Sequence, residues 1–141
     1  MLSDQHFSVV VQPVVSCYLP HLAVVHQTIA RILIPGGLYV VQHKHPASAQ
    51  LSAISPWSTT ISYNDGQVLP YVAGHNHREA GTVEYLHTIE ALIGDLCRAG
   101  FVIEDLSEPC LADYFAPSNS AEQRAVHVPP YLKIKARRRV S

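Results

Sequence analysis

Two short apolar runs flank an amphipathic segment in the first third of the chain. Residues 9–11 and 38–41 are rich in β-branched side chains, which is typical of buried strands. The Gly36-Gly37 pair marks a turn before the second run. The pattern predicts a strand, a helix and a parallel strand, and therefore a sheet covered by helices. The helix is predicted from apolar side chains three or four residues apart, at Leu22, Val25, Ile29, Ile32 and Leu33.

The last third of the chain repeats this change from helical to strand-like spacing. Residues 101–106 and 131–137 are predicted as strands, and residues 116–121 between them as a loop. A helix is expected to begin at Thr82, with Glu84 in its first turn, and to end at Gly100. It is predicted from the apolar spacing of Leu86, Ile89, Ile93 and Leu96.

The segment 46–80 is polar and rich in turn residues. Asn64-Asp65-Gly66 suits a tight turn, and residues 59–63 and 67–71 are expected to pair around it as a small hairpin. A loop this long in a compact domain usually serves as a lid or binding segment. Disorder is the alternative interpretation. Against it stand three aromatic side chains that are costly to leave in water, Trp57, Tyr63 and Tyr71.

Composition and charge narrow the class of protein. With 141 residues, of which 48% are hydrophobic and 15% charged, the chain is expected to form one domain over residues 1–141. A formal net charge of -1 gives no electrostatic reason to expect a nucleic-acid partner. The three cysteines show no C-x-x-C spacing. The sequence also shows no apolar signal segment and no apolar run of the ~18–20 residues that are needed to span a bilayer. These observations predict a cytoplasmic protein.

Several motifs stand in an order that is similar to one known family. They are Ile34-Pro35-Gly36-Gly37, Asn76-His77-Arg78, Ala99-Gly100-Phe101, Glu108-Pro109 and Pro129-Pro130-Tyr131. From residue 7 to residue 137, their order and separation resemble class I S-adenosylmethionine-dependent methyltransferases of the UbiE/SmtA-like group (methyltransferase type 11). The resemblance implies an α/β fold. The expected architecture is a partial Rossmann-like methyltransferase sheet, strands four to seven with flanking helices, mostly parallel with one antiparallel C-terminal strand.

The resemblance covers only the C-terminal half of that family. There the cofactor sits on a glycine-rich loop after the first strand, whereas the seven glycines of this chain include no G-x-G grouping. The implied function is methyl transfer from S-adenosylmethionine to a small-molecule acceptor, by a truncated or incomplete enzyme that alone binds the cofactor weakly or not at all. The alternative is a non-catalytic subunit or interaction module that retains the half-fold. Catalytic residues, the acceptor and its accepting atom are not assigned.

The resemblance also implies positions for two sets of binding residues. Cofactor contacts after the fourth strand of the family correspond here to Gln12, Pro13, Val14 and, one helical step on, Cys17. Proline excludes a contact through the amide of residue 13, and packing beneath the following helix is the alternative role of Val14 and Cys17. The carboxyl edge of the sheet is where open α/β folds bind ligands. The residues expected to face the acceptor there are His45, Trp57, Tyr63, Tyr71, His77 and Arg78.

A metal site is the third hypothesis. His43 and His45 form one H-x-H pair and His75 and His77 another, and residues two apart on a strand point to the same side. No cysteine or carboxylate accompanies them at ligand spacing, so no metal is assigned. Solvated loop histidines remain an equal interpretation.

The first predicted strand also carries an expectation about partners. In the resembled family the missing first strand lies beside this one, so residues 7–12 become an edge strand. The edge offers the unpaired amides of Val9, Val10 and Val11, with no lysine or internal proline to discourage pairing. The chain is therefore expected to self-associate or to need a partner chain that completes the sheet.

Overall fold

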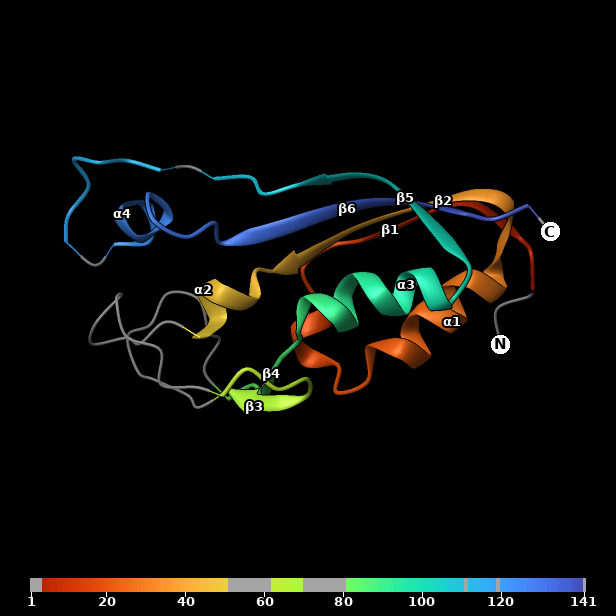
Figure 1. The fold of residues 1–141 in the computed structure, drawn as a ribbon, viewed down its shortest axis with the longest axis horizontal. Helices are drawn as coiled ribbons and strands as arrows, with labels where there is room; N and C mark the ends of the chain where they lie inside the picture. Colours follow the sequence, from red (N-terminus) through yellow and green to blue (C-terminus); the bar gives the residue numbers. More distant parts are fainter. Residues whose placement is uncertain (1–3, 51–61, 70–80, 111, 119, 141) are drawn as a thin grey trace.

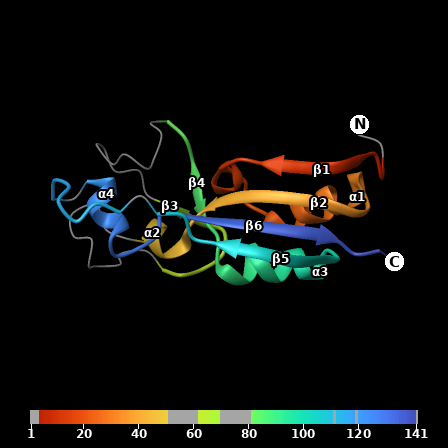
Figure 2. The ribbon, with the colours of Figure 1, turned by 90° about the horizontal axis from the view of Figure 1, so that it is seen from above.

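The computed structural model describes residues 4–50, 62–69, 81–110, 112–118 and 120–140. Its main sheet has four strands in the order β1-β2-β6-β5 (Figure 2). β1 pairs parallel to β2, while β6 is antiparallel to both of its neighbours. The predicted α/β sheet, with a single antiparallel C-terminal strand, is confirmed. The strands are β1 (Phe7–Gln12), β2 (Leu33–Lys44), β5 (Phe101–Ser107) and β6 (Tyr131–Arg138).

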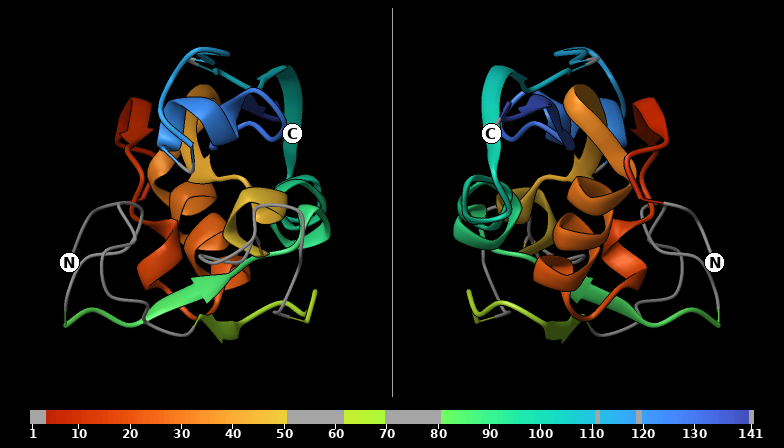
Figure 3. Two further views of the ribbon diagram at one scale, coloured as in Figure 1. Left: turned by 90° about the vertical axis from the view of Figure 1, so that its left-hand side faces the viewer. Right: turned by 90° about the vertical axis from the view of Figure 1, so that its right-hand side faces the viewer.

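Two helical segments cover the same face of this sheet (Figures 1 and 3). α1 (Leu22–Ile32) connects β1 to β2, as its apolar spacing predicts. Two details of this prediction are wrong, because Leu33 begins β2 rather than ending the helix, and Gly36-Gly37 lie within β2 rather than in a turn before it. A π-helical turn, η2 (Glu90–Gly94), continues into α3 (Asp95–Arg98) and leads to β5. Gly100 follows the end of α3 and terminates the helix, as predicted. The φ of Gly100 is 92°, a left-handed conformation that glycine adopts without strain.

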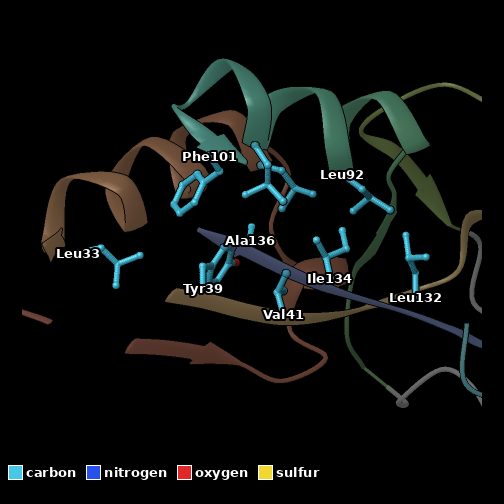
Figure 4. Packing of buried hydrophobic residues seen from close by; sticks show 10 residues of the cluster. Leu33, Tyr39, Val41, Leu92, Phe101, Leu132, Ile134 and Ala136 are labelled. Carbon is cyan, nitrogen blue, oxygen red and sulfur yellow. The ribbon is translucent and has the colours of Figure 1, made fainter. Parts of the chain in front are cut away.

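The core lies between the sheet and these helices. Alternate residues of β2 and β6 point toward the helical layer, and Leu92 of η2 faces them (Figure 4). Tyr39 and Phe101 are fully buried, with ring centroids 5.8 Å apart. The buried cluster comprises Leu22, Leu33, Tyr39, Val41, Leu92, Leu96, Phe101, Leu132, Ile134 and Ala136.

A separate two-stranded ribbon corrects two predictions. β3 (Gln67–Leu69) pairs antiparallel with β4 (Glu84–Leu86). The expected hairpin is therefore wrong in its described part, since residues 62 and 63 form no strand and β3 takes a distant partner. The helix expected from Thr82 is wrong at its start, because residues 84–86 form β4. Thr88 takes the capping role instead, its hydroxyl accepting from the amide of Ala91 at 3.2 Å.

Three short helical segments complete the described fold, namely η1 (Ser16–Tyr18), α2 (Pro46–Gln50) and α4 (Ala121–Ala125). α4 begins where the predicted loop ends, and the hydroxyl of Ser120 accepts from the amide of Gln123 at 3.1 Å. Among the described residues, none of the helices has the length and apolar character required to cross a membrane.

Candidate functional site

The carboxyl ends of β1 and β2 lie at the same edge of the sheet, because the two strands are parallel (Figure 2). The chain leaves β1 at Gln12 and turns into η1, where the amide of Val15 donates to the carbonyl of Pro13 at 2.7 Å. The Gln12 side chain closes this turn, because its Oε1 accepts from the Tyr39 hydroxyl at 2.6 Å and its Nε2 donates to Ser16 Oγ at 2.9 Å. Both ends of the amide are thus used inside the chain.

A small hollow opens behind this turn. Cys17, His43 and His87 contribute to its lining, together with Leu86 and Leu92. The centre of a water molecule can occupy a volume of about 10 Å³ inside the hollow. This is close to the minimum that a cavity needs to hold one water. Cys17 is 3% exposed, and its burial raises the pKa of its thiol above the ordinary value. The thiol therefore stays protonated and faces the interior of the site.

Two buried histidines lie side by side beneath the hollow. His26 of α1 and His43 of β2 are 0% and 1% exposed, and their ring centroids are 6.5 Å apart. Neither ring nitrogen of either residue has a hydrogen-bond partner among the residues that the structure describes. Burial lowers the pKa of His26 to about 4 and that of His43 to about 3, and mutual repulsion adds to the effect in His43. Both rings are neutral near pH 7.

The β3–β4 ribbon is joined to the site by charged side chains. Lys44, the last residue of β2, donates to Glu84 of β4 at 2.7 Å, and the Glu84 side chain is 2% exposed. His87 Nδ1 lies 3.1 Å from Asp65 Oδ1, and its Nε2 lies 2.9 Å from the carbonyl oxygen of Leu19. These contacts hold the ribbon against η1 and the end of β2.

The structure describes two of the six residues that are expected to face the acceptor, His45 and Tyr63. His45 follows β2, where its Nδ1 accepts from the Ala47 amide at 3.2 Å, so its Nε2 donates to Glu108 at 2.8 Å. The Tyr63 side chain is 47% exposed, and its hydroxyl accepts from the Ile89 amide at 2.9 Å. The remaining predicted acceptor residues, Trp57, Tyr71, His77 and Arg78, lie outside the described residues.

The predicted cofactor residues share one turn but differ in what they offer. Pro13 is exposed and Val14 half-buried, so both can make apolar contact with a ligand at this edge. Gln12 and Cys17 face inward, and Pro13 has no amide hydrogen to donate. The described turn therefore offers apolar side chains at Pro13 and Val14, while the side-chain amide of Gln12 is already hydrogen-bonded within the chain.

The described residues do not form the metal site that the H-x-H pairs suggested. No group of three His, Cys, Asp or Glu side chains there is arranged to hold a metal ion. His43 and His45 do not act as a pair, because His43 is buried in the core while His45 binds Glu108. The second H-x-H pair, His75 and His77, lies outside the described residues.

Reasoning from the sequence missed most of the buried polar residues. His26 stands four residues after Leu22 on the apolar face of the predicted helix, and His43 continues the alternation of Tyr39 and Val41. These positions predict burial, so the spacing could have identified the pair. Glu84 could not have been found in this way, because its burial depends on a strand that the helical spacing concealed.

The sequence matches no protein-family model and no curated protein. Solved structures, in contrast, resemble the whole chain. An S-adenosylmethionine-dependent methyltransferase from Mesorhizobium loti aligns with a TM-score of 0.69 and 22% identity over 97% of this chain and 64% of that one. A protein assigned to the same class in Listeria monocytogenes aligns with a TM-score of 0.68 and 19% identity, over 99% of this chain and 65% of that one.

A third structure shows such a fold with a partner. It is a Haloferax volcanii complex of the Trm112 methyltransferase activator with a protein assigned as a methyltransferase. It aligns with a TM-score of 0.61 and 13% identity, over 99% of this chain and 57% of that one. The chain thus spans less than two thirds of the length of these structures. At these identities the likeness establishes the fold, which is that of class I S-adenosylmethionine-dependent methyltransferases.

Proposed function

We propose that the chain supplies the carboxyl-terminal part of a cytoplasmic methyltransferase that transfers a methyl group from S-adenosylmethionine to a small-molecule acceptor. The observation that carries the proposal is the turn at Gln12, which follows a parallel strand at the carboxyl edge of a sheet of methyltransferase fold. Gln12, Pro13, Val14 and Cys17 form the floor beside the cofactor. The polar groups that hold its ribose and methionine come from outside the chain.

The acceptor side is proposed to lie at the same edge. His45 and Tyr63 belong to it, with Trp57, Tyr71, His77 and Arg78 from the segments beyond the described residues. S-adenosylmethionine carries an already activated methyl group, so the protein's part is to orient the acceptor and exclude water. Behind this edge, the neutral His43 and the protonated Cys17 line the small hollow together with Lys44.

The cofactor is the first subject for experiment. Calorimetric titration of the isolated chain with S-adenosylmethionine is expected to give weak or no binding. A low-micromolar isotherm, equivalent to about 8 kcal/mol, would contradict the half-site interpretation. A chimera is then needed, in which the amino-terminal part of the M. loti methyltransferase outside the aligned region is fused before residue 7.

The chimera is expected to bind S-adenosylmethionine. Val14→Trp should weaken its affinity at least tenfold, because the larger side chain obstructs the floor. Val24→Trp is the matched control, since Val24 is 61% exposed on α1 and belongs neither to the turn nor to the lining of the hollow, and it should leave the affinity unchanged. A folded chimera without cofactor affinity would contradict the proposed function.

A non-catalytic subunit or interaction module is the second candidate. The internal bonding of both ends of the Gln12 side chain favours it, since the amide oxygen and nitrogen each already have a partner within the chain. In both candidates the sheet is completed along β1, by self-association or by a partner chain. A chimera that folds but never binds the cofactor would support this second function.

A further inference from the structure

The amino edge of the sheet carries an open groove that the proposed function does not use. Its volume is about 350 Å³, within the ~300–1,000 Å³ of small-molecule sites. The groove lies where β6 ends beside the beginning of β2, since Arg138 of β6 donates to the carbonyl oxygen of Leu33. The turn at Gln12 lies at the opposite, carboxyl edge (Figure 2). The groove is lined by Val102, Glu104, Arg137, Arg138, Arg139 and Val140.

Three guanidinium groups face a single carboxylate in this lining. Arg137 Nη2 donates to Glu104 at 3.0 Å, and this side-chain hydrogen bond lowers the pKa of Glu104 to about 2. Lys135 Nζ lies 3.2 Å from the same carboxylate. Glu104 is thus shared by two cations that lie outside the positions of Arg138 and Arg139. Those two arginines leave the groove with an excess of positive charge.

The two remaining arginines are anchored and still offer donors to a ligand. Arg138 uses Nη1 for the carbonyl oxygen of Leu33. The backbone amide of Arg139 donates to the carbonyl oxygen of Gly100 at 2.9 Å, so the residue is fixed beside the turn that begins β5. The Arg139 side chain makes no hydrogen bond or ion pair with any residue that the structure describes. A guanidinium can donate two parallel hydrogen bonds to a phosphate or carboxylate.

Two valines give the groove apolar contact surfaces beside these cations. Val102 is 48% exposed and Val140 76% exposed, so both are accessible. Val140 lies over the backbone of Gly36, since a Cβ on this glycine would lie 3.7 Å from Val140 Cγ2. The carbonyl oxygen of Gly36 accepts from Arg137 Nη1 at 2.8 Å. This combination suits an anionic group that is carried on an apolar one.

An extended polyanion fits the groove poorly. Beyond Val102, β5 continues with the carboxylates of Glu104 and Asp105, which would repel a chain of phosphates along this strand. Along β6, Lys135 and Arg137 are both occupied by Glu104, so the row of cations is interrupted. A small ligand with one strongly charged group matches the two remaining arginines better.

We propose that this groove binds a small organic phosphate, with the phosphate held by Arg138 and Arg139 and its apolar substituent against Val102 and Val140. A phosphate monoester carries a charge of ~−1.5 to −2 at pH 7 and presents three acceptor oxygens to the two guanidinium groups. The groove is separate from the turn at Gln12, so the inference does not rest on the proposed function. It gives the chain a second ligand, at the edge of the sheet away from methyl transfer.

Phenyl phosphate is the probe, while inorganic phosphate and phenol present its two parts separately. An NMR chemical-shift titration of the chain is expected to give a Kd of about 1 mM or less for phenyl phosphate. Each separate part should bind more weakly. Arg139→Gln should weaken the binding of phenyl phosphate about tenfold or more, because a hydrogen bond between two charged groups is lost.

Lys133→Gln is the matched control. It removes the same charge from the same strand, outside the lining of the groove. At ~3.3 Å per strand residue, Lys133 lies ~20 Å from Arg139, beyond the screening length of ~8 Å in ~0.15 M salt. In this salt it should leave the affinity unchanged. Val102→Asn should weaken the binding of phenyl phosphate but not that of inorganic phosphate, because it alters only the apolar contact.

Absence of phenyl phosphate binding would overturn the inference. Equal losses for Arg139→Gln and Lys133→Gln would do so as well, because they would show attraction by diffuse charge instead of a site. Benzoate bound as tightly as phenyl phosphate would refute the preference for a phosphate. Binding of vesicles that contain phosphatidic acid, without binding of phenyl phosphate, would identify a lipid surface as the occupant and refute the small ligand. Arg139 and Val102 are exposed, so the variants should fold, and circular dichroism checks this.

Discussion

Acidification should destabilise the protein through the buried histidine pair. His26 and His43 have pKa values of about 4 and about 3 in the folded chain, against about 6.5 in an unfolded one. Because the folded values are lower, the unfolded chain binds protons first. Stability is therefore full above pH 6.5 and falls as the pH drops below it.

The magnitude at pH 5 depends mainly on the unfolded pKa. Each histidine is almost fully charged in the unfolded chain at this pH and almost fully neutral in the folded one, which costs about 2 kcal/mol per residue relative to pH 8. The pair therefore costs about 4 kcal/mol, a large share of the ~5–15 kcal/mol that stabilises a typical domain. Of the groups around the pair, Asp95 raises the pKa of His26, whereas His87 lowers that of both residues.

The assay is urea unfolding at pH 8 and pH 5 for the parent chain and the variants His26→Leu, His43→Leu and the double variant. Each single variant should remove about half of the pH-dependent loss. At pH 8 leucine should be tolerated, because it replaces ring nitrogens that have no hydrogen-bond partner in the described part of the chain. His21→Gln, at an exposed position before α1, is the control and should change nothing. A double variant that loses as much stability between pH 8 and pH 5 as the parent would refute the reasoning.

Two further perturbations test the packing around the site. Lys44→Met should lower the free energy of unfolding, measured by chemical denaturation, by about 3–5 kcal/mol, because it leaves the carboxylate of Glu84 buried without its cation. Adding Glu84→Gln to this variant should restore part of the lost stability. A double variant that is no more stable than Lys44→Met would argue against the ion pair. Gly37→Ala should destabilise the fold by about 1–3 kcal/mol, since a Cβ there would lie 2.8 Å from the carbonyl oxygen of Ile34. Gly94→Ala is its control, because its Cβ would meet only the flexible guanidinium of Arg98; equal melting temperatures for the two variants would contradict the steric argument.

Local periodicity was sufficient to predict the main sheet and α1. The strands β1, β2, β5 and β6 and the helix α1 all carry their apolar spacing within one segment, so each could be recognised without its neighbours. β4 was missed because Leu86 satisfies the spacing of the helix that follows as well as that of a buried strand. Its true partner, β3, is distant in sequence, and pairing at such a distance leaves no local pattern.

The place of residues 12–14 in the fold was predictable, but the contacts of their side chains were not. The resemblance put Gln12, Pro13 and Val14 directly after a parallel strand, which is where the structure has them, while it could not show that Gln12 is hydrogen-bonded at both ends of its amide by Tyr39 and Ser16. The bond to Tyr39 joins residues 27 positions apart, which only the fold brings together. Similarly, the buried state of Glu84 depends on Lys44, which lies 40 positions earlier in the chain.

The position of β6 in the sheet has a consequence for the synthesis of the protein. Of the four strands of this sheet, β6 leaves the ribosome last, yet it lies between β2 and β5 and pairs with both. Until residues 131–138 have emerged, β5 lacks its partner strand in this sheet. Tyr39 and Phe101 also lack the packing contacts of the core residues Ile134 and Ala136. A nascent chain can assemble β1, α1 and β2 early, but the sheet closes only once this late strand inserts. Ribosome-bound chains that stop short of residue 131 should therefore keep the apolar sides of β2 and β5 open to chaperones.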